Sequence, residues 1–184
     1  MKLGVVSDIH GSLTAFKEAK DYLKDSDLLL IAGDILYHGA RNPLPAGYDT
    51  EGVLEELKEM EEDFLAVKGN VDALVDDWVL PYPLSEYTVV EDNGRRIAIY
   101  HGYQDETAEE RANFAHQLGA DILVFGHTHL PLIEEVNGVI LLNPGSIALP
   151  KQKPAVSTIA QIDEKQIKLI ALESKEVLKE YKLD

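Results

Sequence analysis

The sequence predicts an α/β fold in which the first half forms parallel strands and the second half forms antiparallel hairpins. Two observations support this prediction. Short apolar runs alternate with helical patterns in the first half, and Asn-Gly pairs at 93–94 and 137–138 separate apolar runs in the second. Strands that alternate with helices pair in parallel through right-handed crossovers. An Asn-Gly pair between apolar runs indicates a tight hairpin.

Five short apolar runs have the composition of buried strands, because Gly, Asp or His follows each of them. These runs are Lys2–Ser7, Asp27–Ala32, Phe64–Lys68, Arg96–Tyr100 and Asp121–Phe125. Further along, the runs at 156–162 and 167–172 predict another hairpin. The segment 174–184 fits either a terminal helix or an edge strand, and the pattern leaves both open.

Three helices are predicted between these strands. Ser12 is a candidate N-cap before apolar residues at helical spacing, and Thr50 holds the same position before a second helix. Thr107 and Glu110 have the spacing of a capping box, which predicts the start of a third helix. The irregular stretch 35–49 is long, and loops of that length usually have a function.

Length and composition exclude several classes of protein. The 184 residues suit one domain over 1–184. Asp and Glu number 33 against 17 Lys and Arg, so the net charge of −16 disfavours long nucleic acids and anionic membranes. The absence of cysteine excludes thiolate catalysis and cysteine-ligated metals. We expect a soluble, cytoplasmic protein without a membrane segment, and the sequence neither demands nor excludes a homo-oligomer.

The side chains that follow the predicted strands indicate a metal site. Seven oxygen or imidazole donors lie there, namely Asp8, His10, Asp34, Asn70, His101, His127 and His129. Strand ends meet at one edge of an open α/β sheet, so these donors can converge. Because residues two apart on an extended segment share a side, we expect Asp8 to face one centre with His10, and His127 with His129. Glycines that permit close approach flank them, at Gly33, Gly69, Gly102 and Gly126.

Oxygen and imidazole donors without sulfur suit Mn²⁺, Fe²⁺, Co²⁺, Ni²⁺ or Zn²⁺ better than calcium or magnesium. Seven donors fit two ions about 3.5–4 Å apart that hold a hydroxide between them and bind a phosphoryl group. Each motif alone also has a structural explanation, since Asp-x-His and Gly-Asp are common in turns and His-x-His occurs by chance on surfaces. Their concurrence at five strand ends favours the metal site.

In order and spacing, these residues resemble the calcineurin-like metallophosphoesterase superfamily across nearly the whole chain. GNVD at 69–72, GHTHLP at 126–131 and NPGS at 143–146 are similar to small bacterial phosphodiesterases of the YfcE type. The resemblance implies a four-layer α/β/β/α sandwich of two mixed β-sheets and Mn²⁺-activated hydrolysis of phosphodiesters. It implies one ion at Asp8, His10 and His129, another at Asn70, His101 and His127, and Asp34 bridging the two.

The sequence departs from the wider superfamily directly after Asn70, where Val71 replaces a histidine thought to protonate the leaving group. Valine transfers no proton, so the acid must come from elsewhere, or the enzyme must favour leaving groups that depart unaided. We predict that His38 supplies a proton or contacts the phosphate, and that Arg41 and Asn42 also bind substrate. An ordinary loop histidine is the alternative for His38.

The predicted function is metal-dependent hydrolysis of small phosphodiesters. We expect a structural role for the NPGS motif, whose turn should lie near His129. A protein-binding scaffold similar to the small retromer subunit is an alternative, because fold alone does not determine activity. A phosphomonoesterase or a cyclic-nucleotide phosphodiesterase would use the same centre, and the sequence does not separate them.

Overall fold

The computed structural model describes residues 1–60 and 63–183, which form eleven strands and three α-helices. The strands are β1 (Leu3–Val6), β2 (Leu28–Ile31), β3 (Phe64–Ala66), β4 (Tyr87–Asp92), β5 (Arg95–Tyr100), β6 (Ile122–Val124), β7 (Leu132–Val136), β8 (Val139–Asn143), β9 (Thr158–Ile162), β10 (Gln166–Ala171) and β11 (Val177–Lys182). The helices are α1 (Leu13–Leu23), α2 (Thr50–Met60) and α3 (Ala108–Leu118), and Asp76–Trp78 forms a turn of 3₁₀-helix.

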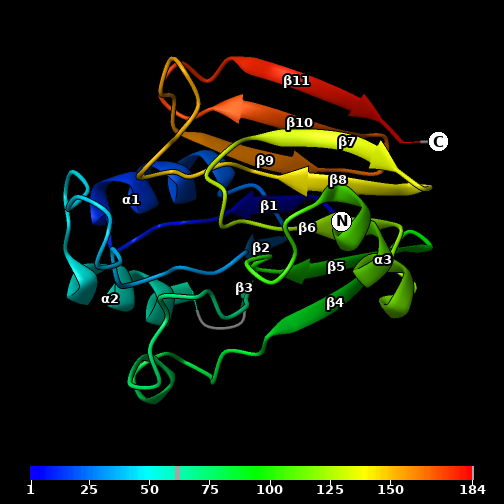
Figure 1. Cartoon of the computed structure of the whole chain (residues 1–184). Coiled ribbons are helices and arrows are strands. Elements are labelled where there is room, and N and C mark those ends of the chain that lie inside the picture. The colour runs from blue at the N-terminus through cyan, green and yellow to red at the C-terminus, as the bar shows by residue number, and fades with distance from the viewer. Residues whose placement is uncertain (61–62, 184) are drawn as a thin grey trace.

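The strands form two mixed sheets (Figure 1). The first has the order β11-β10-β9-β1-β2-β3, with β1, β2 and β3 parallel and the other neighbours antiparallel. The second has the order β4-β5-β6-β8-β7, with β5, β6 and β8 parallel between antiparallel edge strands. The parallel first half and the Asn-Gly hairpins β4–β5 and β7–β8 are confirmed, although the second half also contains parallel pairs.

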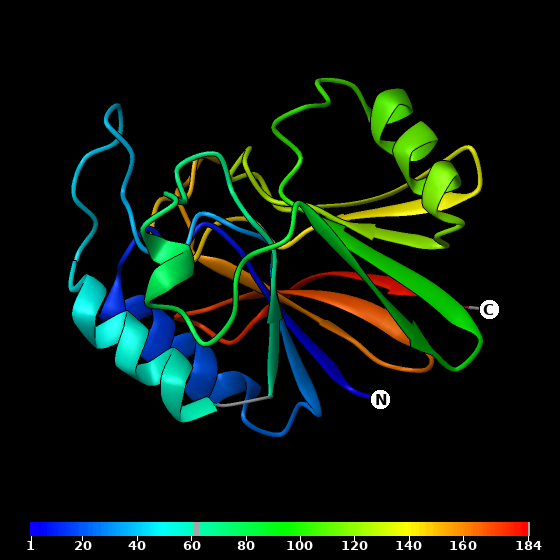
Figure 2. The ribbon, with the colours of Figure 1, turned by 90° about the horizontal axis from the view of Figure 1, so that it is seen from below.

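The two sheets pack face to face, and helices cover their outer faces (Figure 2). Helices α1 and α2 lie on the first sheet, where Phe16 and Leu57 belong to its outer core. Leu30 and Ile99 belong to the central core between the sheets. Leu123 belongs to a third core beneath α3. Three cores therefore separate four layers, and the predicted α/β/β/α sandwich is confirmed.

Strand β5 explains why the predicted strands are apolar throughout. Ile97 and Ile99 belong to the central core, whereas Ala98 and Tyr100 belong to the core beneath α3. None of the four is more than 2% exposed. Because both faces of the strand are covered, it has no polar side, and the alternation typical of half-buried strands is absent.

The helix starts follow the sequence with one difference. Ser12 caps α1, and Thr107 begins α3 with the predicted capping box. Thr50, which we expected as the cap of the second helix, is instead the first residue of α2. Asp49 takes the capping role, because its Oδ1 accepts a hydrogen bond from the Gly52 N–H at 2.9 Å, and aspartate caps helices at least as well as threonine. Among the described residues, no helix is long and apolar enough to cross a membrane.

The segment 174–184 contains a strand rather than a helix. Strand β11 pairs antiparallel with β10 and forms an edge of the first sheet. Of the two alternatives for this segment, the edge strand is therefore correct over Val177–Lys182. Asp184 lies outside the described residues.

Candidate metal centre

The residues that follow five strands meet at one edge of the sandwich. Asp8 follows β1, Asp34 follows β2, Asn70 follows β3, His101 follows β5 and His127 follows β6. His101 Nε2 lies 3.2 Å from Asp34 Oδ2 and 3.1 Å from Asn70 Oδ1. The His127 N–H donates to Asp8 Oδ2 at 3.1 Å across 119 residues of sequence. The structure thus brings together side chains from both sheets.

Five of the predicted ligands have a left-handed backbone. The φ angle is 54° at Asp8, 47° at His10, 56° at Asp34, 64° at His127 and 58° at His129. This conformation costs about 1–3 kcal/mol for a residue with a side chain, and residues that adopt it concentrate at functional sites. The expectation that alternation along an extended segment aligns these side chains is wrong, because Asp8, His10, His127 and His129 have left-handed rather than extended backbone angles.

Asp8, His10 and His129 form the first group of candidate ligands. His129 Nε2 lies 3.2 Å from Asp8 Oδ1 and 3.3 Å from His10 Nε2, and His10 Nε2 lies 3.6 Å from Asp8 Oδ1. None of the three residues is more than 2% exposed. Asp8 Oδ1 is buried and accepts no hydrogen bond from the described residues. A buried carboxylate oxygen without a partner is unfavourable, so this group fits a divalent cation.

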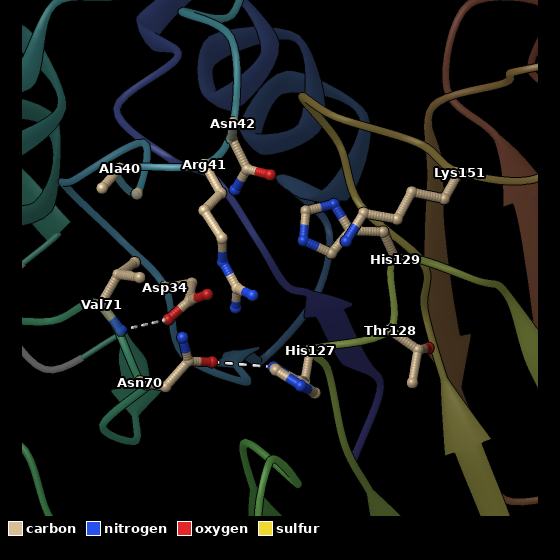
Figure 3. Close-up of a pocket in the computed structure, with 11 residues that line it drawn as sticks. Asp34, Ala40, Arg41, Asn42, Asn70, Val71, His127, Thr128, His129 and Lys151 are labelled. Carbon is tan, nitrogen blue, oxygen red and sulfur yellow. Dashed lines mark hydrogen bonds between the residues drawn. The ribbon is translucent and has the colours of Figure 1, made fainter.

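Asn70, His101 and His127 form the second group, and Asp34 lies between the groups. Asn70 Oδ1 is 2.8 Å from His127 Nδ1, the contact drawn as a dashed line in Figure 3. Asp34 Oδ2 lies 3.2 Å from His101 Nε2 and 3.7 Å from His10 Nε2. One carboxylate oxygen therefore faces both groups, which is the position of a shared ligand.

Three imidazoles are oriented so that Nε2 faces the centre. His10 Nδ1 lies 2.9 Å from the Tyr37 carbonyl oxygen. His101 Nδ1 lies 2.6 Å from the Ala32 carbonyl oxygen. His129 Nδ1 lies 2.6 Å from the Leu149 carbonyl oxygen. A carbonyl oxygen only accepts hydrogen bonds, so Nδ1 carries the proton and donates it. With Nδ1 held in this way, Nε2 faces the centre and can bind a metal ion that displaces its proton, which is the arrangement in which histidine binds metal ions.

The charges in the centre favour a bound cation. Burial alone raises the pKa of Asp8, but the imidazoles of His10 and His129 lower it more, so that its pKa lies well below the usual range. Burial lowers the pKa of His101, whereas the carboxylates of Asp34 and Asp8 raise it more, to about 9. The Asp8 carboxylate therefore stays ionised in the buried centre, and a divalent cation would supply compensating positive charge there.

Asp72 is a functional residue to which sequence reasoning gave no role. Its carboxylate accepts hydrogen bonds from the main-chain N–H groups of Asp34 at 2.8 Å, Ile35 at 2.7 Å and Gly69 at 2.7 Å. Burial raises the pKa of Asp72 to about 6, and the hydrogen bonds of Ile35 and Gly69 oppose that rise. Asp72 thus fastens the segment after β2 to the segment after β3. The only sequence signal was its place in the GNVD motif.

The NPGS turn lies beside the first group, as predicted. Ser146 Oγ donates to the Asp8 carbonyl oxygen at 2.8 Å and accepts from the Leu149 N–H at 2.8 Å. The Leu149 carbonyl oxygen in turn holds His129. Asn143 Nδ2 donates to the Gly126 carbonyl oxygen at 2.7 Å. These contacts orient the candidate ligands and leave the turn itself outside the chemistry.

Three of the four predicted glycines are required by close packing, and at Gly69 a Cβ atom would clash with the Asp34 carboxylate and main-chain nitrogen. A Cβ atom at Gly33 would lie 2.7 Å from His101 Nδ1, and one at Gly126 would lie 2.9 Å from Asp8 Oδ2. Ser7 Oγ also approaches Gly126 closely, and it donates to Asp8 Oδ2 at 2.7 Å. Any larger residue at these positions would push the candidate ligands apart.

A cavity of about 670 Å³ opens over the centre (Figure 3). Its lining residues are Asp34, Gly39, Ala40, Arg41, Asn42, Asn70, Val71, His127, Thr128, His129 and Lys151. Arg41 and Asn42, predicted as substrate contacts, belong to this lining. His38 does not belong to it, because its ring packs against Tyr37 and Tyr48 with centroids 4.6 and 5.4 Å away.

Comparison with known proteins identifies the family. Residues 1–166 match the family model described as the calcineurin-like phosphoesterase superfamily domain. The chain belongs to this superfamily. It is 36% identical to phosphodiesterase YfcE of Escherichia coli (strain K12) over 181 residues, and the aligned residues cover 97% of this chain and 96% of that protein. The solved structure of YfcE superimposes with a TM-score of 0.88 at 32% identity over 100% of both chains. The predicted resemblance is confirmed, and a phosphoesterase enzyme is supported.

The fold is also similar to that of Vps29. Vps29 of Entamoeba histolytica, described as complexed with zinc, superimposes with a TM-score of 0.69 at 23% identity, covering 100% of this chain and 99% of that chain. At this identity the likeness concerns the fold alone. A shared fold does not determine activity, so the residues of the site decide the function.

Proposed function

We propose that the protein is a metal-dependent phosphodiesterase that hydrolyses small phosphodiesters. In this proposal Asp8, His10 and His129 hold one divalent ion, Asn70, His101 and His127 hold a second, and Asp34 is shared. The observation that supports it best is the position of Asp34 Oδ2, within 3.7 Å of His10 Nε2 and 3.2 Å of His101 Nε2. The donor set suits Mn²⁺, and Zn²⁺, Fe²⁺, Co²⁺ and Ni²⁺ accept the same donors.

When bound, two such ions would supply an activated water and neutralise charge on the phosphoryl oxygens. The chain itself positions the substrate. Arg41 and Asn42 line the cavity on the side opposite His129 and Lys151 (Figure 3), and we assign them to the phosphoryl oxygens. Asn42 is in turn fixed by a hydrogen bond from its Nδ2 to the His38 carbonyl oxygen at 2.8 Å.

The leaving group receives no proton from position 71. The Val71 N–H donates to Asp34 Oδ1 at 3.0 Å, so the main chain orients the shared ligand while the side chain offers no acid. We therefore expect aryl phosphodiesters to be hydrolysed at least about 10²-fold faster than alkyl phosphodiesters, because aryloxides depart without protonation. Initial rates on matched aryl and alkyl substrates measure this ratio, and a ratio near one would show that an acid acts elsewhere.

That His38 is this acid stays a prediction. Its Nδ1 is buried and has no hydrogen-bond partner among the described residues. The variant His38→Ala tests it on the same two substrates. A loss confined to the alkyl substrate would assign the proton to His38, whereas wild-type rates on both substrates would remove His38 from the mechanism.

Metal removal and restoration test the proposed function. Treatment with a chelator should abolish hydrolysis of an aryl phosphodiester, and added Mn²⁺ should restore it. Metal binding alone is not sufficient, because a protein of the same fold is described as a zinc complex. Tight Mn²⁺ binding with no turnover of mono-, di- or cyclic phosphates would favour the scaffold. A higher rate on phosphomonoesters or cyclic nucleotides would reassign the substrate.

A further inference from the structure

Two cationic side chains reach into the cavity from opposite sides. Figure 3 shows Arg41 entering from the loop after β2 and Lys151 entering from the segment after β8. Within residues 1–60 and 63–183, neither side chain forms an ion pair with a carboxylate. The two positive charges are therefore available to a ligand in the cavity.

This arrangement contrasts with the rest of the chain, in which acidic residues outnumber basic ones by 33 to 17. Several lysines elsewhere pair with carboxylates, as Lys17 does with Glu56 at 3.1 Å and Lys68 with Asp77 at 3.1 Å. The carboxylate that belongs to the described cavity lining is that of Asp34, which faces the metal centre. The local charge of the cavity is thus opposite to that of the molecule.

Lys151 is tied to the metal centre through the main chain. Its N–H donates to the His129 carbonyl oxygen at 3.2 Å, and the Leu149 carbonyl oxygen fixes the His129 ring. The Lys151 side chain lines the same cavity as His127 and His129, so its ammonium group lies beside the candidate metal centre.

The size and charge of the cavity exceed the needs of a simple diester. A phosphodiester has one negative charge, which two divalent ions already neutralise. About 670 Å³ is the size of a site for a whole small molecule rather than for one phosphoryl group. Beyond Arg41, which we assign to the phosphoryl oxygens, Lys151 is a further unpaired cation, and it favours a ligand with additional negative charge because complementary charges determine which ligands bind.

We propose, on the basis of the proposed phosphodiesterase function, that the substrates are phosphodiesters with a second anionic group on the part that stays attached to phosphorus. Lys151 binds this second group, while Arg41 contacts the phosphoryl oxygens. The cavity then selects for charge, while the metal centre performs the hydrolysis. Lys151 is accordingly a specificity-determining residue.

Three p-nitrophenyl diesters with the same leaving group test this proposal. Their second substituents are propyl, 3-carboxypropyl and choline, which are neutral, anionic and cationic. With the Mn²⁺-loaded enzyme, kcat/KM for the carboxypropyl ester should exceed that for the propyl ester by about tenfold, and the choline ester should be the poorest. In Lys151→Gln, the kcat/KM values for the carboxypropyl and propyl esters should lie within about threefold of each other. The kcat/KM for the propyl ester should stay close to its wild-type value.

Lys153→Gln is the matched control, because Lys153 is exposed, lies two residues away and does not belong to the described cavity lining. It should keep the wild-type preference. If carboxypropyl and propyl esters react equally with the wild type, the second-anion proposal is wrong while the phosphodiesterase stands. If Lys151→Gln lowers kcat/KM for all three substrates by the same factor, Lys151 acts on the phosphoryl group and the proposal is also wrong.

Binding of phosphonates separates this proposal from the proposed function, because it needs no turnover. Calorimetry on the Mn²⁺-loaded protein compares 3-carboxypropylphosphonate with propylphosphonate. The carboxylate should improve affinity about tenfold in the wild type and not in Lys151→Gln. Equal affinities in the wild type would overturn the proposal. Tighter binding of the carboxylate without hydrolysis of any diester would support the subsite and contradict the phosphodiesterase.

Discussion

The two halves of the candidate metal centre differ in how the fold supports them. Asp8, His10 and His129 are at most 2% exposed and lie beneath the NPGS turn. In the other half, His101 is equally buried at 1% exposed, but Asn70 is exposed and His127 is only half-buried. Both halves border the cavity, the first through His129 and the second through Asn70 and His127, and the second half is the more exposed.

This difference indicates two kinds of metal binding. Ligands that are buried and fixed by hydrogen bonds to the main chain are already oriented, so an ion there loses little free energy in organising its site. Exposed ligands such as Asn70 are less constrained than buried ones, so we expect their ion to exchange more readily. We expect a tightly bound ion in the first half and an exchangeable one in the second.

Removing the shared ligand should have the largest effect. Asp34→Ala takes a carboxylate from both halves, so hydrolysis should fall by more than about 100-fold and Mn²⁺ binding should weaken at both positions. Steady-state rates and a calorimetric Mn²⁺ titration measure the two effects. Two undisturbed Mn²⁺ sites in this variant would show that Asp34 is not shared.

His127 and His129 belong to different halves of the centre, so replacing each in turn tests the halves separately. His129→Ala should remove the ion that survives dialysis, whereas His127→Ala should remove only the exchangeable ion, with a loss of activity of about 10- to 100-fold. Metal content after dialysis, measured by elemental analysis, distinguishes the variants. If both retain the same amount of metal, the two halves bind equally and the comparison fails.

Asp72→Ala should have a smaller effect on activity and a clear effect on stability. The variant leaves three main-chain N–H groups without their acceptor, and each costs about 1–3 kcal/mol of unfolding free energy. Urea denaturation measures this loss, and Mn²⁺ affinity should fall by about tenfold because the segment that holds Asp34 loosens.

Asp76→Ala is the control for Asp72. The Asp76 carboxylate also accepts a main-chain hydrogen bond, from Ala73 N–H at 2.8 Å, but it does not belong to the described lining of the metal cavity. This variant should lose stability and keep its Mn²⁺ affinity. Equal Mn²⁺ affinity in both variants would remove Asp72 from the positioning of the centre.

The sequence predicted the fold and the gathering of donors because both depend on local patterns. Apolar runs identify buried strands, and the residue after each run lies at the strand end. The left-handed backbone of Asp8 and His10 was not predicted, because it depends on contacts with the segment after β2. The role of Asp72 was also missed, since its main-chain partners Asp34 and Ile35 lie 38 and 37 residues away.

Anomalous diffraction from crystals grown with Mn²⁺ would locate the bound ions. We expect two manganese peaks, one among Asp8, His10 and His129 and one among Asn70, His101 and His127, with Asp34 adjacent to both. A single peak, or peaks away from these residues, would contradict the proposed two-ion centre.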